Sequence, residues 1–327
     1  MNSKSFLIFL SVFAILNPLN AQYDFDAIEK ARMAKANVKV QTQWTCDYVN
    51  GKPADKGYRS TVTKYDTKGN VIEITNYSSD GKLISTLTYR YDNRGNPVSF
   101  ERSDDKREVK IRQLTVYDAA GNKIRESGFN GSAQFPYSHS FTYDATGRLT
   151  EVKYMENNAL VERRAFKYTG NKTEVSIFDG NDQLTFRQES TYTEKGMLLS
   201  EVRTGGANNA VVQSLNMQHN SAGDLTEEVK KRADNKLEYQ KLYQYDKNNR
   251  PIKVETVNLD GTKFVANEYQ YNSNGDLILE SWKKNNKTPE PSTKKYTYDA
   301  KGLYTDVDCY FSTYKLQSLY KYTYEFY

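Results

Sequence analysis

The stretch Tyr65-Asp66-Thr67-Lys68-Gly69-Asn70 decides the fold, because it recurs along the chain about every 26 residues. Each copy starts at an anchor residue, and the later anchors are Tyr91, Tyr117, Tyr143, Tyr168, Tyr192, His219, Tyr245, Tyr271 and Tyr298. A period of this length is typical of a repeat architecture, in which each repeat is one supersecondary unit. We therefore expect a repeat array over residues 38–327.

The repeat unit is predicted to be a β-hairpin. Its aspartate accepts a hydrogen bond from a backbone N–H two or three residues on, and its glycine takes the left-handed conformation that a tight turn needs. A second turn signal follows about thirteen residues later, at Asp80-Gly81, Asn130-Gly131, Asn157-Asn158, Asp234-Asn235 and Asp260-Gly261. Two turns per repeat leave strands of roughly eight residues. The fold class is therefore all-β, a continuous antiparallel β-hairpin meander of about 20 strands.

The two faces of this sheet differ in chemistry. Side chains alternate across a strand, so the residue two positions before each anchor shares its face. These pairs are aromatic in most repeats: Tyr89 with Tyr91, Phe141 with Tyr143, Phe166 with Tyr168, Tyr243 with Tyr245, Tyr269 with Tyr271, and Tyr296 with Tyr298. The residue between them is polar, as in Arg90, Thr142 and Lys167. A sheet with one aromatic side is expected to curl or spiral so that this side becomes the core, with a ligand-binding face as the alternative.

The first residues predict export and a cap. Lys4 precedes an apolar run over residues 6–16, and Ala21 offers a small residue for cleavage, which is typical of a signal peptide over residues 1–21. The mature protein is then secreted or periplasmic. Residues 22–37 are predicted to form a short helical N-terminal cap, started by Asp24 or Asp26, that covers the first edge strand.

Catalytic and metal-binding signals are sparse. The histidines are His139 and His219, and neither a nucleophile elbow nor a His-Glu-x-x-His motif is present. The anchor aspartates are interpreted as turn caps rather than calcium ligands, because each repeat offers one carboxylate. The 46 basic and 41 acidic residues are interspersed, which excludes the basic patch of a nucleic-acid-binding protein. We expect no enzyme activity, no cofactor, no metal and no nucleic-acid partner.

The two cysteines, Cys46 and Cys309, lie near opposite ends of the array. An exported protein could oxidise them to a disulfide. About 20 strands spaced about 4.8 Å apart span roughly 100 Å, whereas a disulfide needs Cα atoms within about 7 Å. A disulfide within one chain would therefore require the sheet to close on itself.

The segments Tyr89-Arg90-Tyr91-Asp92-Asn93-Arg94-Gly95-Asn96 and Phe141-Thr142-Tyr143-Asp144-Ala145-Thr146-Gly147-Arg148 resemble the YD or Rhs repeat family. The resemblance covers most of residues 58–327. It implies a β-hairpin sheet that spirals into a shell or cylinder, as in family members that enclose a toxin or sit in adhesion proteins. This chain has neither the long carboxy-terminal toxin domain nor the proline-and-glycine-rich autoproteolytic boundary of the large members, so toxin delivery is not carried over.

Three functions remain open from the sequence. The first is a non-catalytic interaction or structural module at the cell envelope, with a protein or glycan as partner. The second is a glycan-binding module that uses exposed aromatic rings. The third is an outer-membrane β-barrel, favoured by the aromatic Phe326-Tyr327 terminus and opposed by charged residues such as Lys64 and Arg90 on the row that would face lipid.

Candidate contact residues lie where the repeat is irregular. Trp44 and Trp282 fall outside the aromatic rows, so they are candidates for exposed contacts. The loops at 205–209, 129–137 and 283–291 depart most from the turn pattern. Within the first two loops, the candidates are Asn208, Asn209, Phe135 and Tyr137.

Overall fold

The computed structural model describes residues 25–131, 136–206 and 208–327. The described residues form one helix, α1 (Phe25–Lys35), and 23 β-strands. The predicted antiparallel meander and the short N-terminal helix are both confirmed, and the number of strands slightly exceeds the expected 20. The predicted signal peptide and Phe135 lie outside the described residues. Within the described ranges, no helix has the length and apolar character needed to cross a membrane.

The chain divides into two compact units. The larger unit comprises residues 25–165, 178–183 and 265–327, and the smaller unit comprises 166–177 and 184–264 of the described chain. The larger unit holds α1 and the strands β1 (Val38–Val49), β2 (Lys52–Pro53), β3 (Tyr58–Tyr65), β4 (Val71–Tyr77), β5 (Leu83–Tyr91), β6 (Pro97–Ser103), β7 (Val109–Tyr117), β8 (Lys123–Asn130), β9 (Pro136–Tyr143), β10 (Leu149–Glu156), β20 (Leu277–Trp282), β21 (Ser292–Tyr298), β22 (Tyr304–Phe311) and β23 (Leu316–Phe326). The smaller unit holds β13 (Leu184–Tyr192), β14 (Leu198–Gly205), β15 (Val211–His219), β16 (Leu225–Arg232), β17 (Leu237–Tyr245) and β18 (Pro251–Val257). Three further strands, β11 (Ala159–Thr169), β12 (Lys172–Asp179) and β19 (Lys263–Tyr271), have residues in both units.

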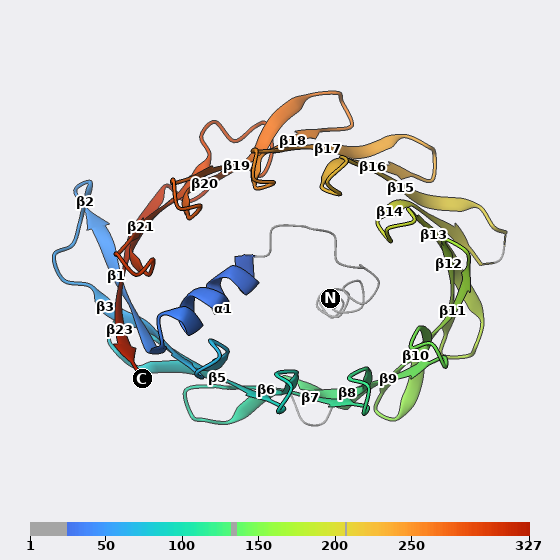
Figure 1. Cartoon of the computed structure of the whole chain (residues 1–327), viewed down its shortest axis with the longest axis horizontal. Coiled ribbons are helices and arrows are strands. Elements are labelled where there is room, and N and C mark those ends of the chain that lie inside the picture. Colours follow the sequence, from blue (N-terminus) through green and yellow to red (C-terminus); the bar gives the residue numbers. More distant parts are fainter. Residues whose placement is uncertain (1–24, 132–135, 207) are drawn as a thin grey trace, which may run out of the picture. The chain divides into compact units, whose positions relative to one another are not determined.

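The first long strand of the chain pairs with the last one. In the larger unit, β1 lies between β3 and β23, with Val40 opposite Lys64 on one side and Thr45 opposite Tyr320 on the other (Figure 1). The expected curled or spiralled sheet is therefore corrected, since the two ends of the array hydrogen-bond to each other, a point that the sequence left open. The helix does not cover an edge strand either, because β1 has a partner on each side.

In both units, consecutive strands pair antiparallel with one irregularity per anchor. In the smaller unit Glu189 lies opposite Val202, and Tyr243 lies opposite Val254. The register shifts immediately before an anchor, as between Gln244 and Tyr245. Each such β-bulge strengthens the local twist and changes which residues of the next strand share the anchor's face.

The anchor aspartates cap the turns, as the Asp66 turn shows. One carboxylate oxygen of Asp66, Oδ1, accepts the backbone N–H groups of Lys68 and Asn70, each at 2.9 Å, and Oδ2 accepts the Asn70 side-chain amide at 2.8 Å. The donors therefore lie two and four residues on, rather than two or three. Gly69 has φ +77°, the left-handed conformation predicted for it.

The anchor tyrosines join successive repeats. The Tyr91 hydroxyl donates to the carbonyl oxygen of Val71 at 2.9 Å, which lies 20 residues earlier in the preceding hairpin. The same 20-residue bond joins Tyr143 to Lys123 and Tyr245 to Leu225. The period of the sequence thus reflects a repeated side-chain to backbone contact as well as a repeated turn.

The tyrosine face, defined as the face of each sheet that carries the anchor tyrosines, is mostly not a packed core. Tyr65 is buried, whereas the other described anchors from Tyr91 to Tyr298 are half-buried. The interpretation of this face as core therefore holds around Tyr65, where α1 packs on it, and at buried rings such as Phe141 and Phe166, but not along the whole row of anchors.

Candidate functional site

Helix α1 lies near β1 in the larger unit (Figure 1). It packs on the tyrosine face of this unit through one apolar cluster. Met33 and Leu303 are fully buried there, and Val38 and Tyr65 are nearly so. The backbone of the helix also approaches the Asp66 turn closely, because a Cβ atom on Gly69 would lie 2.2 Å from the carbonyl oxygen of Lys30. These contacts fix α1 against β1 and the β3–β4 turn.

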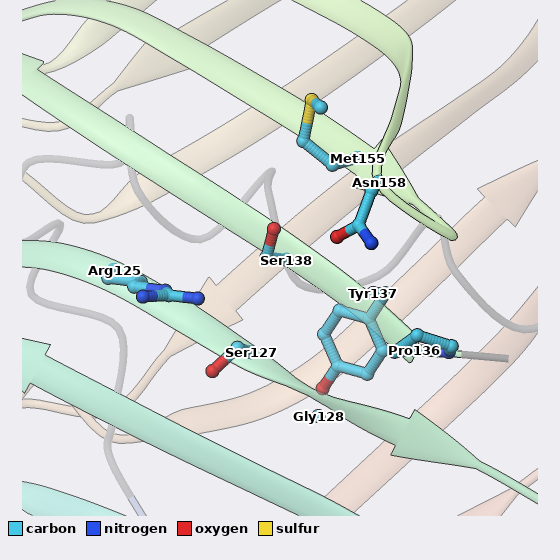
Figure 2. Close-up of a pocket in the computed structure, with 8 residues that line it drawn as sticks. All are labelled: Arg125, Ser127, Gly128, Pro136, Tyr137, Ser138, Met155 and Asn158. Carbon is cyan, nitrogen blue, oxygen red and sulfur yellow. The ribbon is translucent and has the colours of Figure 1, made fainter. Parts of the chain in front are cut away.

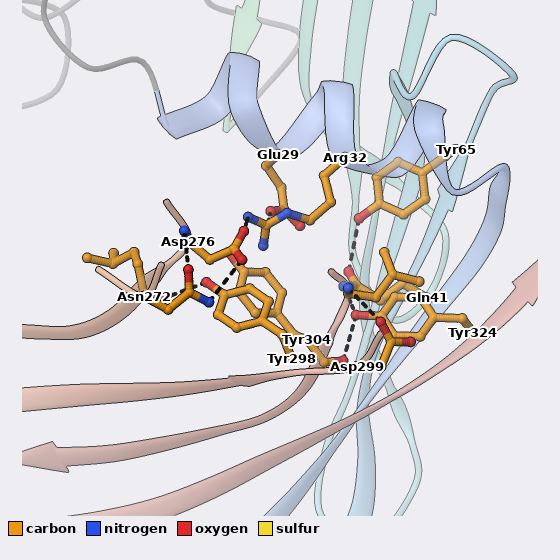
Figure 3. Close-up of polar contacts among 12 residues, drawn as sticks. Glu29, Arg32, Gln41, Tyr65, Asn272, Asp276, Tyr298, Asp299, Tyr304 and Tyr324 are labelled. Carbon is orange, nitrogen blue, oxygen red and sulfur yellow. Dashed lines mark hydrogen bonds and ion pairs between the residues drawn. The ribbon is translucent and has the colours of Figure 1, made fainter. Parts of the chain in front are cut away.

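A cation-binding cluster lies beside this apolar contact (Figure 3). The Arg32 guanidinium donates from Nη2 to Oδ1 of Asp276 at 3.0 Å and lies over the rings of Tyr298 and Tyr304, at 4.8 and 5.1 Å from their centroids. Glu29 adds a second carboxylate at 3.7 Å. A carboxylate and two aromatic faces around one guanidinium combine an ion pair with cation–π attraction.

The carboxylate of Asp276 is available because its turn has exchanged two residues. In the regular turn, aspartate follows the anchor and asparagine comes four residues later, as in Asp66 and Asn70. In this turn Asn272 comes first and Asp276 comes fourth after it. The Asn272 side chain caps the turn by accepting the N–H of Asp276 at 2.9 Å and donating to its Oδ2 at 3.1 Å, which leaves Oδ1 for Arg32.

Burial sets the electrostatics of this cluster. It raises the pKa of the Glu29 carboxyl, an effect that the Arg32 charge opposes. It also raises the pKa of the Tyr304 phenol, and the nearby Glu29 carboxylate adds to that increase. The cluster is therefore poorly hydrated, which strengthens the attraction between the Arg32 guanidinium and its carboxylate partners.

The rest of the tyrosine face combines half-exposed rings with charged groups. The Tyr296 hydroxyl donates to Glu280 at 3.1 Å, and the Lys294 ammonium lies 5.6 Å from the centre of the Trp282 ring. The hydroxyl of Tyr154 donates to Glu156. Rings with hydroxyl and carboxylate groups at their edges stack on and hydrogen-bond to a polar ligand.

The opposite face is mixed rather than uniformly polar, because exposed apolar side chains such as Leu114 and Val116 lie there beside charged ones. It carries ion pairs between neighbouring strands, such as Lys64 with Glu73 at 2.8 Å and Arg112 with Glu101 at 2.7 Å. Both pairs lie on the side of the sheet away from the anchors, because Lys64 directly precedes Tyr65 and Glu101 pairs with Thr88.

A small hollow lies between β8, β9 and β10 (Figure 2). Its volume is about 150 Å³, and it is lined by Arg125, Ser127, Gly128, Pro136, Tyr137, Ser138, Met155 and Asn158. Small-molecule sites have volumes of about 300–1,000 Å³, so this hollow does not define a ligand site. In the part of the chain that the structure describes, no three His, Cys, Asp or Glu side chains are grouped to hold a metal ion.

The two tryptophans lie on opposite faces of the larger unit. Trp44 is opposite Lys321 and is exposed, with its indole N–H donating to Thr323 at 3.3 Å. Trp282 is opposite Asn267, on the tyrosine face, and is half-buried beside Phe311. They do not form one site.

The other predicted contacts are also scattered. Asn208 and Asn209 are turn residues of the smaller unit, where Asn209 accepts a hydrogen bond from Arg187 at 2.6 Å. Tyr137 lies in the larger unit next to His139, and burial raises its pKa to about 12. His219 ends β15 at an anchor position, and its two ring nitrogens are buried without a hydrogen-bond partner among the described residues.

Cys46 and Cys309 are both buried and both free. Cys46 is opposite Leu319 and Cys309 is opposite Ser318, so β23 separates the two strands that carry them. Because Leu319 and Ser318 are consecutive, their side chains point to opposite faces. The possible disulfide is therefore not formed, although the array does bring its two ends together.

Arg32 and Asp276, which are 244 residues apart in the sequence, were not predicted as members of one site. The exchange of asparagine and aspartate at positions 272 and 276 is the signal that could have found it. This exchange occurs in one other described turn, at Asn220 and Asp224.

No protein-family model and no curated protein matches the chain. Among solved structures, the chain is similar to a porin-like protein from Bacteroides uniformis ATCC 8492, with 12% identity, a TM-score of 0.34, and 65% of this chain and 94% of that chain covered. It is also similar to a porin-like protein from Bacteroides vulgatus ATCC 8482, with 10% identity, a TM-score of 0.22, and 88% and 98% of the two chains covered. Both TM-scores are low, so these similarities carry no functional argument.

Proposed function

We propose that the protein is a non-catalytic binding protein of the cell envelope that binds its ligand on the tyrosine face. In the larger unit, the pairing of β1 with β23 leaves neither end of the array as a free edge, which protects the sheet from pairing with another chain. The resemblance to YD or Rhs repeats belongs to this proposal as well, since that family is also built from repeated hairpins.

The half-exposed tyrosine face is the observation that carries the binding role. A row of tyrosines that served only as core would be buried throughout, as Tyr65 is under α1. The described anchors from Tyr91 to Tyr298 keep accessible surface, and carboxylates such as Glu280 hydrogen-bond to rings of the same face. Rings flanked by such acceptors suit the faces and hydroxyl groups of a sugar.

A glycan array tests this role with the two tryptophans as a matched pair. We expect the purified protein to bind glycans, with binding reduced at least about tenfold, or 1.4 kcal/mol, in Trp282→Ala. Trp44→Ala should bind as the unchanged protein does, because Trp44 lies on the opposite face. Equal loss in both variants, or no binding to any sugar, would contradict a glycan-binding tyrosine face.

An outer-membrane β-barrel is the second candidate. The β1–β23 pairing favours it over an open repeat module, because transmembrane strands must form a closed sheet. The opposite face would then contact lipid, where each lysine or arginine at the bilayer midplane costs about 2–4 kcal/mol. The ion pairs of Lys64 and Arg112 lie on that face, which is why we propose a water-soluble binding protein as the first candidate.

Extraction distinguishes the two candidates. We expect the protein to be recovered in the soluble fraction without detergent and to remain monodisperse in buffer. A transmembrane barrel would instead sediment with membranes, resist carbonate extraction and need detergent to stay in solution. The second result would favour the outer-membrane candidate and would leave the tyrosine face as the lining of a channel.

A further inference from the structure

The exchanged turn that holds Arg32 in the larger unit has a counterpart in the smaller unit. Asn220 follows the anchor His219, and Asp224 comes four residues later, as Asn272 and Asp276 do. The hydrogen bonds are the same, since the N–H of Asp224 donates to Asn220 at 2.9 Å and the Asn220 amide donates to Oδ2 of Asp224 at 2.9 Å. Both turns therefore leave Oδ1 of the aspartate unused by the turn itself.

The next anchor tyrosine is placed alike in both units. The Tyr298 hydroxyl donates to the carbonyl of Leu277, directly after Asp276, at 2.7 Å, and the Tyr245 hydroxyl donates to the carbonyl of Leu225, directly after Asp224, at 2.8 Å. Burial and the Asp224 charge raise the pKa of Tyr245 to about 12. Asp276 acts in the same direction on Tyr298. The ring that lies under the Arg32 guanidinium thus has an equivalent beside Asp224.

The two carboxylates differ in what they bind. Asp276 accepts Arg32, whereas Asp224 has no ion pair and no partner for Oδ1 among the residues that the structure describes. Asp224 is nevertheless 3% exposed. A buried carboxylate without a cation is unfavourable, because its lost hydration is not offset by an opposite charge.

We infer that Asp224 and Tyr245 form a guanidinium-binding site on the tyrosine face of the smaller unit, equivalent to the Asp276 and Tyr298 site that Arg32 fills in the larger unit. The ligand is a guanidinium group, either on a small molecule or on an arginine side chain of a peptide. This inference rests on the proposed use of the tyrosine face for binding, and it adds the chemical group that one position on that face recognises.

The site in the smaller unit is the weaker of the two. Pro251 occupies the position of Tyr304, six residues after the anchor, so one of the two rings is missing. Arg250 occupies the position of Leu303, and its charge is paired with Asp246 at 2.5 Å. An incoming guanidinium therefore meets one ring and one carboxylate, and we expect binding that is weaker than at the Asp276 site.

The test uses methylguanidinium chloride and the tripeptide Gly-Arg-Gly as probes, with binding to the purified protein followed by NMR chemical-shift changes. Arg32→Ala vacates the Asp276 site and calibrates the assay. The deciding variant carries Asn220→Asp and Asp224→Asn together, which restores the regular order of Asp66 and Asn70 and so preserves the turn. Methylammonium chloride serves as the control cation.

We expect the unchanged protein to bind methylguanidinium, and the double exchange to weaken that binding at least tenfold. Tighter binding of the tripeptide than of methylguanidinium would assign the site to a peptide, and equal binding would assign it to small molecules. Absence of binding to the unchanged protein would overturn the inference, as would equal binding by the double exchange. Neither of these results tests glycan binding through Trp282, so the glycan array tests the proposed function independently of this inference.

Discussion

Replacing Met33 with alanine is expected to lower the free energy of unfolding of the larger unit by about 2–5 kcal/mol, the range for a large-to-small change in a packed core. Met33 is fully buried in the only apolar cluster that joins α1 to the sheet among the described residues. Leu303 and Val38 line the cavity that the truncation would leave, and both belong to strands or turns that the helix holds together. The cluster contains only three other buried side chains, those of Val38, Tyr65 and Leu303, so little apolar contact between α1 and the sheet would remain.

The measurement is urea unfolding followed by tryptophan fluorescence. Both tryptophans of the chain, Trp44 and Trp282, belong to the larger unit, so the signal reports the unit that contains Met33. Ile28→Ala is the matched control, because Ile28 is on the same helix and is 36% exposed. We expect the control to change stability by less than about 0.5 kcal/mol. Equal losses of unfolding free energy in the two variants would show that α1 stabilises the larger unit through helix propensity rather than through packing of Met33.

The hairpins could be predicted because their determinants are local. An aspartate and a glycine within six residues, as in Asp66 and Gly69, contain the carboxylate acceptor and the left-handed backbone that the turn requires. Alternation then assigns the faces without further information, and the polar row with Lys64 was assigned correctly. Alternation alone does not locate the bulge before each anchor.

Closure of the array could not be predicted because its determinants are distant in sequence. The bonds between β1 and β23 join residues near 40 to residues near 320, and β1 lacks the turn phrase that marks a regular repeat. The two cysteines indicated only that a disulfide within the chain would require the sheet to close. They could not show closure, because Cys46 and Cys309 point to opposite faces and form no disulfide. Arg32 and Asp276 are 244 residues apart, and only the exchanged turn marks the second of them.

The substitution Gly69→Ala is expected to be more harmful than any other glycine-to-alanine change in the regular turns of the larger unit. Gly69 has φ +77°, which costs an alanine about 1–2 kcal/mol. The new Cβ would also lie 2.2 Å from the Lys30 carbonyl oxygen and 2.9 Å from the Ala34 nitrogen. Both are backbone atoms of α1, so the helix must move, at a further cost of about 1–3 kcal/mol.

Gly81→Ala separates these two costs. Gly81 has φ +80° in a turn of the same unit, and a Cβ there would meet nothing within 4 Å. Its alanine variant should therefore lose only the conformational part, again measured by urea unfolding of the larger unit. The excess loss in Gly69→Ala then measures how firmly α1 is seated on the tyrosine face.

Limited trypsin digestion tests whether α1 moves away from the Asp66 turn in Gly69→Ala. If the helix lifts away from the turn, cleavage after Lys30 and Arg32 should accelerate in Gly69→Ala and stay slow in Gly81→Ala, because Met33 and Arg32 lose their partners together. Rapid cleavage in both variants, or in neither, would mean that α1 is not held by the turn. The Arg32 side chain would then be held beside Asp276 by its ion pair alone. The position of α1, with its apolar and charged contacts, would not contribute.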